Sequence, residues 1–434
     1  MQKKSIGVGL LGLGVISGQT ARVLRDKAAL LAEQVGCPLE LRKIKVLPQD
    51  LERPLAKEFS RDLFTTDDDE FFAVPGIDIV VEAIGGEHPA FEYHQRALSA
   101  GKSMVTSNKE LIAKRGAELF ALAQKHNASV RYEASVGGGI PLISPFMFDL
   151  VANDLRGIYA IINGTTNYIL TRMAKEGADF ATVLKNAQEL GYAEANPKND
   201  VEGIDSTYKL AILASLGFHT HVRPEDIHHE GISRLTSRDF RYAKELGFAV
   251  KLLAIGKQDE KSVEVRVHPV FISEDSLLAK VDGVYNAILV NGDLVGNVIF
   301  YGQGAGPLPT SSAVIADVVS VAQDIAAGIG NRAHYVSKPK SIKPMSEVVT
   351  RYYIRMSVAD QAGVLAQITR VLGDNKISIS AVIQKESDLK TQSAEIVIMT
   401  HPASEAGMQR ALKEMEKLSI VKEISNFIRV EDGC

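Results

Sequence analysis

The sequence predicts an α/β protein in three parts: a doubly wound parallel sheet, an α+β domain, and a smaller domain of order βαββαβ. Residues 1–135 alternate between apolar strand-like runs and helical periodicity, which is typical of a parallel sheet covered by helices. Residues 350–434 repeat strands and helices in a different order. The length of 434 residues is enough for roughly two to four domains.

Composition and charge exclude several classes of function. The net charge is −4 and no long basic run occurs, so neither nucleic acid nor an anionic membrane surface is an expected partner. No apolar run reaches the length of a membrane span, and the apolar N-terminus turns polar at Ser17 without a signal-peptide cleavage site. Only Cys37 and Cys434 are present, which gives no disulfide framework and fits a reducing, cytoplasmic setting.

The first part is predicted to span residues 1–135 with a return segment at 305–335. Its order is β-α-β-α-β, which argues for a doubly wound parallel sheet. The expected strands are 5–11, 39–47, 77–84, 102–106 and 128–134, and the expected helices are 17–35, 89–100 and 109–126.

The middle part, residues 136–304, is predicted to be a substrate and dimerisation domain with a more antiparallel sheet. A strand at 156–163 precedes three helices, and four strands follow, at 248–256, 262–271, 284–290 and 294–300. The helices are expected at 165–176, 180–190 and 203–217. Asn291-Gly292 between the last two strands favours a hairpin. The apolar strands need a covering face, which predicts a homodimer or homotetramer.

A linker is expected at 335–349, where prolines, lysines and serines gather. The remaining residues, 350–434, read as strand, helix, strand, strand, helix, strand. This self-contained βαββαβ order is the ferredoxin-like pattern.

A glycine-rich turn near the N-terminus predicts a nucleotide-binding, Rossmann-type domain. Gly12 permits the tight turn and Gly14 lets the backbone approach a pyrophosphate, while the following helix presents free N–H groups. Ser17 replaces the third glycine of the usual motif, and Gly18 follows it. The alternative is a purely structural turn in another doubly wound fold.

The choice between NAD and NADP stays open. Asp50 and Glu52 are candidates for the acidic residue that binds the ribose hydroxyls, and Arg53 and Lys57 stand near the same position.

The charged loop 191–209 is the strongest candidate for chemistry. It runs into an almost wholly apolar helix, and a charged cluster there is costly unless it binds something. Asp205 and Lys209 are four residues apart, so on a helix they share one face with Ile212 and Leu213. The alternative is an ordinary surface pair at this spacing.

Four histidines, at 219, 221, 228 and 229, have no nearby cysteine and no zinc-binding spacing. They indicate a solvated polar loop, and no transition metal is assigned.

Seven motifs occur in one order along the chain: GLLGLG, VVEAIGG, VTSNKELIA, YEASVGGGIPLI, INGTTNYIL, GYAEANPKNDVEGIDSTYKLAILASL and GQGAGPLPTSSAV. Together they resemble the homoserine dehydrogenases, in the single-function form with a C-terminal ACT domain. The likeness covers essentially the whole chain, and the segment from Asp360 to Leu365 resembles the D-x-x-G-V-L turn of ACT domains.

The resemblance implies reversible reduction of L-aspartate 4-semialdehyde to L-homoserine with NADP or NAD, in threonine, methionine and isoleucine biosynthesis. It implies Lys209 as the proton donor, with Asp205 and Lys109 beside it. A lysine can protonate the developing alkoxide, and two neighbouring lysines would lower each other's pKa. The substrate-binding residues that the resemblance implies are Glu194, Asp200, Asp205, Gly164, Thr165 and Tyr192. On the residues alone, Thr165 is as well explained as a helix N-cap, and Lys109 as a partner of a helix end.

The resemblance also implies a cofactor set, a cation site and an effector site. The cofactor residues are Gly12, Leu13, Gly14, Val15, Ile16, Gly85, Ser107, Lys109, Gly191, Gly302 and Gly304. A monovalent cation, sodium, is implied at Glu133, Val136, Gly138 and Ile140, mostly through backbone carbonyls. Asp360 and Gly363 are implied to bind an effector, with L-threonine expected. A competing hypothesis is an amino-acid-sensing regulatory protein with a degenerate dehydrogenase domain. The presence of Lys109, Asp205 and Lys209 argues against this degeneracy.

Overall fold

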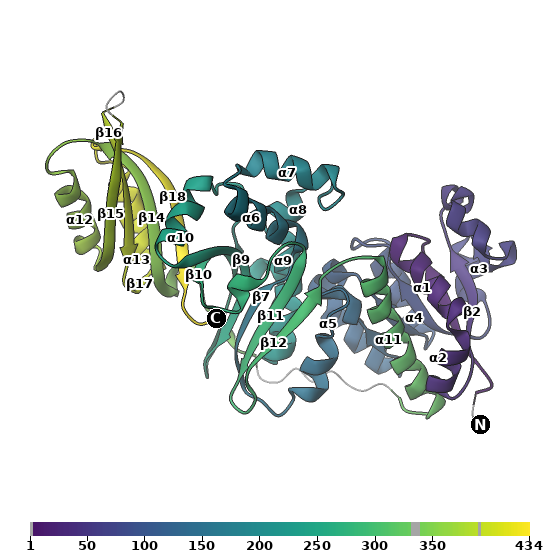
Figure 1. Cartoon of the computed structure of the whole chain (residues 1–434). Coiled ribbons are helices and arrows are strands. Elements are labelled where there is room, and N and C mark those ends of the chain that lie inside the picture. Colours follow the sequence, from purple (N-terminus) through teal and green to yellow (C-terminus); the bar gives the residue numbers. More distant parts are fainter. Residues whose placement is uncertain (1–2, 331–338, 389–391) are drawn as a thin grey trace. The chain divides into compact units, whose positions relative to one another are not determined.

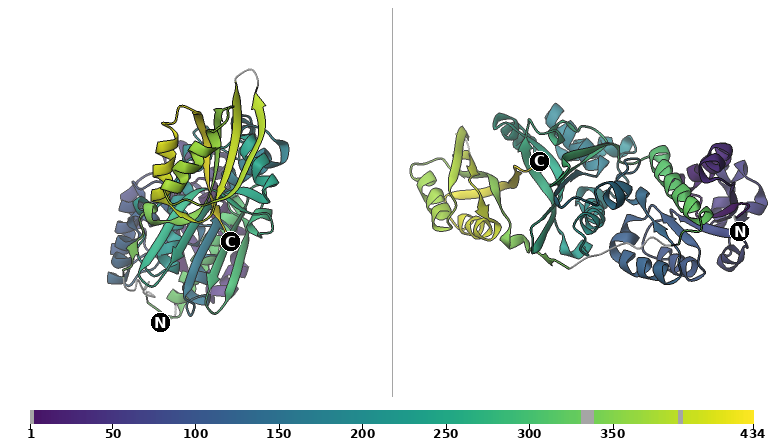
Figure 2. Two further views of the ribbon diagram at one scale, coloured as in Figure 1. Left: turned by 90° about the vertical axis from the view of Figure 1, so that its left-hand side faces the viewer. Right: turned by 90° about the horizontal axis from the view of Figure 1, so that it is seen from below.

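The computed structural model describes residues 3–330, 339–388 and 392–434. The chain forms two compact units (Figures 1 and 2). Unit 1 combines Met1–Asp154, Ala211–Pro224 and Phe300–Pro339, and unit 2 combines Leu155–Leu210, Glu225–Ile299 and Lys340–Cys434. The first part of the predicted linker lies outside the described residues.

Unit 1 contains a six-stranded sheet of order β3-β2-β1-β4-β5-β6, in which every pair of neighbours is parallel. This is the order of a doubly wound nucleotide-binding sheet, so the predicted fold class is confirmed. The strands are β1 (Ile6–Leu11), β2 (Leu39–Lys45), β3 (Phe64–Thr65), β4 (Ile77–Glu82), β5 (Ser103–Thr106) and β6 (Val130–Arg131).

The helices of unit 1 are α1 (Val15–Asp26), α2 (Ala28–Val35), α3 (Asp68–Ala73), α4 (Ala90–Ser99), α5 (Lys109–Lys125) and α11 (Pro307–Ala326). The single helix expected at 17–35 is in fact two, because Lys27 leaves the helical conformation at φ −111° and ψ 20°. No glycine or proline marks this break, so the sequence carries no signal for it. Strand β6 is also shorter than expected.

The core of unit 1 lies between β1 and the helices that cover it. Ile6, Val8 and Leu10 of β1 are fully buried and pack in one cluster with Val314 and Val318 of α11. Burying each such side chain stabilises the fold by about 1.5–3 kcal/mol. A segment 300 residues away in sequence therefore helps to hold the strand that carries the glycine-rich turn.

The other sheet has the order β12-β11-β7-β9-β10-β18-β14-β16-β15, and it belongs to unit 2 apart from the end of β12 from Phe300 on. Its middle-domain strands are β7 (Leu155–Ile161), β9 (Phe248–Gln258), β10 (Ser262–Ser273), β11 (Tyr285–Gly292) and β12 (Gly296–Gln303). They pair antiparallel where their registers are defined, as the sequence predicts. Strands β11 and β12 are neighbours, but Asn291-Gly292 ends β11 and the turn follows it.

Five helices belong to the middle part of the chain: α6 (Gly164–Glu176), α7 (Phe180–Glu189), α8 (Lys198–Val201), α9 (Ile204–Gly217) and α10 (Ser237–Glu245). Of α9, the residues up to Leu210 lie in unit 2. Neither the short α8 nor α10 was expected from the sequence.

The C-terminal part has the predicted βαββαβ order. Its elements are β14 (Val349–Ala359), α12 (Val364–Asp374), β15 (Ile379–Asp388), β16 (Ser393–Thr400), the two-residue β17 (Ala403–Ser404), α13 (Glu405–Met415) and β18 (Val421–Glu431). Helices α12 and α13 lie on one face of these strands (Figure 2), and both contribute to a single core with β14 and β16.

This C-terminal part is not self-contained, which corrects the expectation from the sequence. Strand β18 pairs in parallel with β10, with Val270, Phe271 and Ile272 opposite Arg429, Val430 and Glu431. The sheet of the middle part therefore continues into the C-terminal part. The pairing joins strands more than 150 residues apart, which no local pattern announces.

Within the described residues, no helix is long and apolar enough to cross a membrane.

Candidate active site

The glycine-rich turn connects β1 to α1 in unit 1. Gly12 has φ +88°, a backbone conformation that favours glycine, and an added Cβ there would lie 2.7 Å from Ile84. Gly14 is the N-cap of α1, and no side chain caps this helix start. The first N–H groups of the helix are therefore not taken by a side-chain cap, which suits a phosphate group.

A cavity of about 470 Å³ opens beside this turn. The structure brings four predicted cofactor residues to its wall: Gly12, Leu13, Gly14 and Gly85. The turns before α1 and after β4 meet here because β1 and β4 are parallel neighbours and their carboxyl ends share one edge of the sheet.

Residues at and just beyond the end of β2 also line the cavity, and one of them, Lys45, was missed by sequence reasoning. Lys45, the last residue of β2, contacts Tyr93 Oη at 3.1 Å and Asp68 Oδ1 at 3.0 Å. Arg53 is half-exposed and pairs with Asp50 Oδ1 at 2.9 Å. Asp50, a candidate for binding the ribose hydroxyls, lines the cavity, but its carboxylate also accepts the Leu47 N–H. Glu52 does not line the cavity.

Glu82, at the end of β4, shapes the turn that carries Gly85. Its buried carboxylate accepts the N–H groups of Ile84 and Gly85 and the Thr106 hydroxyl at 2.7 Å. Burial alone would raise the pKa of Glu82, but His94 together with these donors holds that pKa below its ordinary value. The carboxylate therefore stays charged and fixes the turn.

The other predicted cofactor residues do not line this cavity. Val15 and Ile16 begin α1, Ser107 follows β5, and Lys109 is the first residue of α5 in unit 1. Gly191 lies in unit 2 and is exposed.

Unit 2 carries the predicted catalytic pair. Lys209 Nζ donates to Asp205 Oδ2 at 2.6 Å and to the Ile162 carbonyl at 2.8 Å. The Lys209 side chain is 12% exposed and that of Asp205 is 7% exposed. This is a largely buried ion pair and not the surface pair that the spacing alone allows. The two acceptors account for two of the three N–H donors of the ammonium group.

Asn163 connects this pair to Asp200. Its Nδ2 donates to Asp200 Oδ1 at 2.7 Å and to Asp205 Oδ2 at 2.9 Å, while its Oδ1 accepts the Thr166 N–H. Asn163 is therefore the N-cap of α6, and Thr165 is not. The sequence signal for it was the Asn-Gly-Thr-Thr run, which predicted a cap but not a link between two carboxylates.

The remaining predicted substrate-binding residues, Gly164, Thr165, Tyr192 and Glu194, lie close in sequence to Asn163 or Asp200. The Thr165 hydroxyl donates to the Tyr192 carbonyl at 2.7 Å, so the start of α6 is tied to the charged loop. Gly164 packs closely, because an added Cβ would lie 2.9 Å from the Val284 carbonyl oxygen. The side chains of Tyr192 and Glu194 are exposed.

The predicted cation loop of unit 1 is built from backbone. The Glu133 carboxylate accepts three N–H groups, from Leu142, Ile143 and Ser144, at 2.6–2.9 Å. Three of the roughly four lone-pair sites of this carboxylate are thus already engaged by the chain. Asp317 accepts the Glu133 N–H, and burial together with the Glu133 charge raises the pKa of Asp317 to about 8.

This loop lies against the predicted cofactor-closing loop. An added Cβ on Gly138 would lie 2.6 Å from the Gly304 carbonyl, and the Gly139 N–H donates to the Gln303 carbonyl. An added Cβ on Gly302 would lie 3.1 Å from the Ile140 side chain. Among the described residues, no group of three or more His, Cys, Asp or Glu side chains is arranged to hold a metal ion.

The C-terminal part presents the predicted effector turn. Gly363 has φ +87° and is the N-cap of α12, with no side-chain cap. Asp360 and Gly363 are both exposed.

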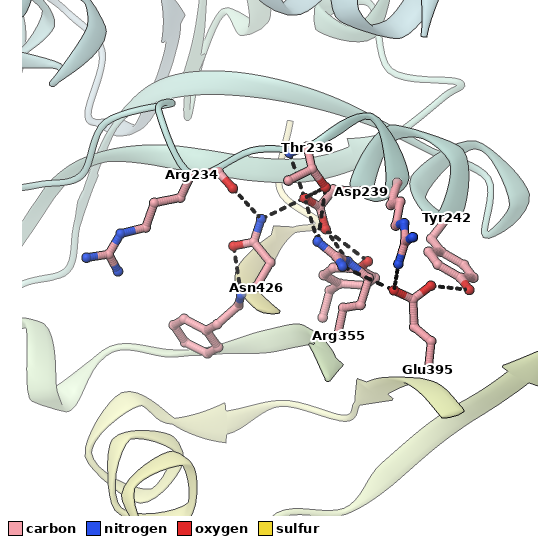
Figure 3. A network of polar contacts seen from close by, with 10 residues as sticks. Arg234, Thr236, Asp239, Tyr242, Arg355, Glu395 and Asn426 are labelled. Atoms are coloured by element: carbon pink, nitrogen blue, oxygen red, sulfur yellow. Dashed lines mark hydrogen bonds and ion pairs between the residues drawn. The ribbon is translucent and has the colours of Figure 1, made fainter. Parts of the chain in front are cut away.

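A buried network ties α10 to the C-terminal strands (Figure 3). Asp239 of α10 pairs with Arg355 Nε of β14 at 2.9 Å and accepts the Asn426 amide of β18 at 2.8 Å. Arg355 also contacts Glu395 of β16 at 3.1 Å, and Glu395 accepts the Tyr242 hydroxyl. Asp239 is fully buried and Arg355 is 4% exposed.

These arrangements define what the chain can do chemically. Unit 1 offers a nucleotide-sized cavity at an uncapped helix start, and unit 2 offers a buried ammonium group held by carboxylates. The first suits a dinucleotide phosphate, and the second suits proton transfer to an oxygen that becomes negative.

Family models match three segments of the chain: homoserine dehydrogenase, NAD binding domain, at residues 12–133; homoserine dehydrogenase at 141–319; and ACT domain at 352–419. The chain is 42% identical over 434 residues to the homoserine dehydrogenase of Neisseria gonorrhoeae, covering 99% of each chain. It is 38% identical to that of Bacillus subtilis, again covering 99% of each.

Solved structures agree with these matches. The crystal structure of a homoserine dehydrogenase from Thiobacillus denitrificans has a TM-score of 0.93 and 43% identity, covering 100% of both chains. A hyperthermophilic archaeal homoserine dehydrogenase mutant in complex with NADPH has a TM-score of 0.63 and 27% identity, covering 73% of this chain and 97% of that one. The chain therefore belongs to the homoserine dehydrogenases, NAD(P)-dependent oxidoreductases, and carries an ACT domain.

Proposed function

We propose that unit 2 binds L-aspartate 4-semialdehyde through its carboxylates and that Lys209 protonates the aldehyde oxygen as it is reduced to L-homoserine. Asp200, Asp205 and Glu194 supply negative charge for the substrate's α-ammonium group. When bound, the reduced nicotinamide cofactor supplies the hydride. In the reverse direction Lys209, as the neutral amine, takes the hydroxyl proton.

The buried position of Lys209 carries this proposal. Its ammonium is fixed by Asp205 and the Ile162 carbonyl, and a third N–H remains for a substrate oxygen. A preorganised charge in a largely buried site stabilises the developing alkoxide without reorganisation during the reaction. Lys109 of unit 1 is proposed as a second lysine beside the nicotinamide.

Cofactor binding is proposed at the unit 1 cavity, whose features fit a dinucleotide. Gly12 and Gly14 let the backbone approach a pyrophosphate, and α1 presents uncapped N–H groups. Lys45 and Arg53 place two cations at the wall beyond β2, where the adenosine ribose is expected. We therefore propose NADPH over NADH, because these cations suit a 2′-phosphate and Asp50 is already paired.

The carbonyls of Glu133, Val136, Gly138 and Ile140 are proposed to hold a sodium ion. The contact between Gly138 and Gly304 supports a role in fixing the loop of Gly302 and Gly304 against the cofactor. Hard cations prefer oxygen ligands of this kind.

The ACT domain is proposed to bind L-threonine at Asp360 and Gly363, as feedback control by an end product. The uncapped start of α12 at Gly363 supports capture of an amino-acid carboxylate there. The chain is further proposed to act in the cytoplasm as a homodimer or homotetramer, which light scattering on the purified protein would test.

The first experiment follows loss of NADPH or NADH absorbance with aspartate 4-semialdehyde. Wild type and Lys209→Ala are compared, each with and without L-threonine. We expect turnover in the wild type, its collapse in Lys209→Ala, and its suppression by threonine. Equal turnover in Lys209→Ala would refute the proton-donor role, and unchanged turnover with threonine would refute the proposed effector.

A further inference from the structure

The segment Glu230–Thr236 touches two parts of unit 2 that have different roles. One end is held by the ACT domain: Arg429 of β18 pairs with Glu230 at 2.9 Å. The other end is held by it too, because the Asn426 amide donates to the Arg234 carbonyl at 3.4 Å and Arg355 donates to the Thr236 hydroxyl. The ACT domain therefore fixes both ends of this segment.

The middle of the segment packs on α8, the short helix that contains Asp200. The Ile232 N–H donates to the Val201 carbonyl at 2.9 Å, and the Ser233 hydroxyl contacts Glu202. Gly231 lies so close that an added Cβ would come within 2.5 Å of the Val201 carbonyl oxygen and 2.8 Å of the Glu202 Cα. Only glycine fits this contact without moving α8.

From α8 the contacts reach the candidate substrate site in one step. Asp200 is the residue before Val201, and its carboxylate accepts the Asn163 amide that also holds Asp205. A shift of Val201 thus moves the Asp200 carboxylate relative to Asp205 and Lys209.

The attachment of the segment to the ACT domain is polar and local. A cavity of about 880 Å³ lies between the segment and the ACT elements α13 and β18, with Glu202, Gly231, Lys413 and Glu423 among its walls. Solid packing does not fill this space, so on the ACT side the segment is held by the ion pair of Arg429 and by the Asn426 and Arg355 contacts, while on its other side the Glu230 N–H donates to the Val267 carbonyl of β10 at 2.8 Å.

We propose that Glu230 and Gly231 are positioning residues that link the ACT domain to the substrate-binding carboxylate Asp200. The proposal rests on the proposed role of Asp200 and deepens the proposed regulation by naming its structural path. In this proposal a movement of β18 shifts Arg429 and Glu230, and the segment then moves against Val201. The Asp200 carboxylate is displaced as a result, which weakens its ion pair with the substrate's α-ammonium group. The chemical step at Lys209 is not addressed directly, so binding is affected more than turnover.

The test compares Gly231→Ala and Glu230→Gln with matched controls. Gly373→Ala is the control for the glycine, because an added Cβ there meets nothing within 4 Å. Glu274→Gln is the control for the carboxylate, because Glu274 is exposed in the same unit. For Gly231→Ala we expect KM for aspartate 4-semialdehyde to rise about tenfold, the scale of one charge-assisted hydrogen bond. We expect kcat within about threefold of wild type and KM for NADPH unchanged.

The double variant provides a readout that a purely structural role would not move. Because both residues act on one path, Glu230→Gln added to Gly231→Ala should raise KM no further. Multiplying effects, or KM equal to that of the controls, would overturn the proposal. If Gly231→Ala does not fold by circular dichroism, Glu230→Gln alone decides, and an unchanged KM overturns it. A wild type without turnover refutes the proposed function, whereas turnover with an unchanged KM refutes only the link.

Discussion

Asp205 and Asp239 lie in similar settings in unit 2 but differ in what surrounds them. Each belongs to the first turn of a helix, and each pairs with a cation in a buried position. Lys209 Nζ lies 2.6 Å from Asp205, and Arg355 Nε lies 2.9 Å from Asp239. In each case an asparagine amide donates a further hydrogen bond. The two sites differ in the cation and in where it comes from.

At the candidate active site the cation comes from the same helix, one turn on. In the buried network between α10 and the ACT strands, called the ACT junction below (Figure 3), the cation is Arg355 of β14. Arg355 donates to Glu395, and the Tyr353 hydroxyl donates to Asp239. Arginine stays charged at any accessible pH and offers several fixed donors, so it suits a clamp between distant segments. Lysine can release a proton, so it suits a reaction. An aspartate in this setting therefore suits the proposed proton transfer when its partner is a lysine and a structural clamp when its partner is an arginine.

Exchanging the proposed catalytic cation, Lys209, should have the largest effect. Lys209→Arg keeps the charge beside Asp205 but replaces an ammonium, which can donate a proton, with a guanidinium, which does not. We expect kcat to fall by about 10²- to 10⁴-fold, the usual contribution of a general acid, with the circular dichroism spectrum unchanged. Lys185→Arg, in an exposed pair with Glu189 at the same i,i+4 spacing, is the control and should retain full activity. A kcat within tenfold of wild type would contradict the distinction between the two cations.

Removing the junction cation should affect stability instead. Arg355→Met leaves Asp239 buried without its charge partner, which costs about 3–5 kcal/mol of unfolding free energy. Urea unfolding followed by circular dichroism and tyrosine fluorescence measures this, since the chain has no tryptophan. Arg351→Met, on the same strand in a more exposed pair with Asp432, should cost far less. We expect kcat of the folded Arg355→Met enzyme to stay near wild type, and a loss comparable to that of Lys209→Arg would be evidence against a purely structural clamp.

These two sites also mark where sequence reasoning succeeds and fails. The contact of Asp205 with Lys209 was predictable because helix geometry alone brings residues i and i+4 together. The glycine turn after β1 was predictable for a similar reason, since its requirements are local. Arg355 and Asp239 meet across 116 residues, and nothing in either local pattern announces the other.

The same limit explains what was missed near the candidate active site. Asn163 was recognised as part of a cap, but its link to Asp200 and Asp205 depends on the fold of a loop about 40 residues away. Lys45 falls inside the strand expected at 39–47 and was not singled out, and it lines the cavity because β2 lies beside β1. The pairing of β10 with β18 depends on a tertiary arrangement in the same way.

Lowering the pH should weaken the junction moderately. Burial would raise the pKa of Glu395, but hydrogen bonds from Tyr242, Arg238 and Arg355 hold that pKa below its ordinary value. A lowered pKa means that this contribution to stability is fully present above the unfolded-state pKa and is lost as pH falls through the folded-state pKa. Between pH 5 and pH 3 we expect the melting temperature to drop by a few degrees more in wild type than in Glu395→Gln, because the loss begins only below the unfolded-state pKa. Parallel curves for the two proteins would show that Glu395 does not couple the junction to pH.

A third cation–aspartate pair, Arg53 with Asp50 in unit 1, extends the comparison to an exposed position. The Arg53 side chain is 52% exposed, so its bond to Asp50 is worth little and can be exchanged for a stronger acceptor. A 2′-phosphate on the cofactor is such an acceptor, because arginine binds it with two parallel hydrogen bonds. We expect Arg53→Ala to lower kcat/KM for NADPH by about tenfold, or roughly 1.4 kcal/mol, with kcat/KM for NADH nearly unchanged. Lys57→Ala, an exposed lysine outside the cavity wall, should change neither value. Equal losses with both cofactors would show that Arg53 stabilises the η1 segment (Pro48–Glu52) and does not select the cofactor.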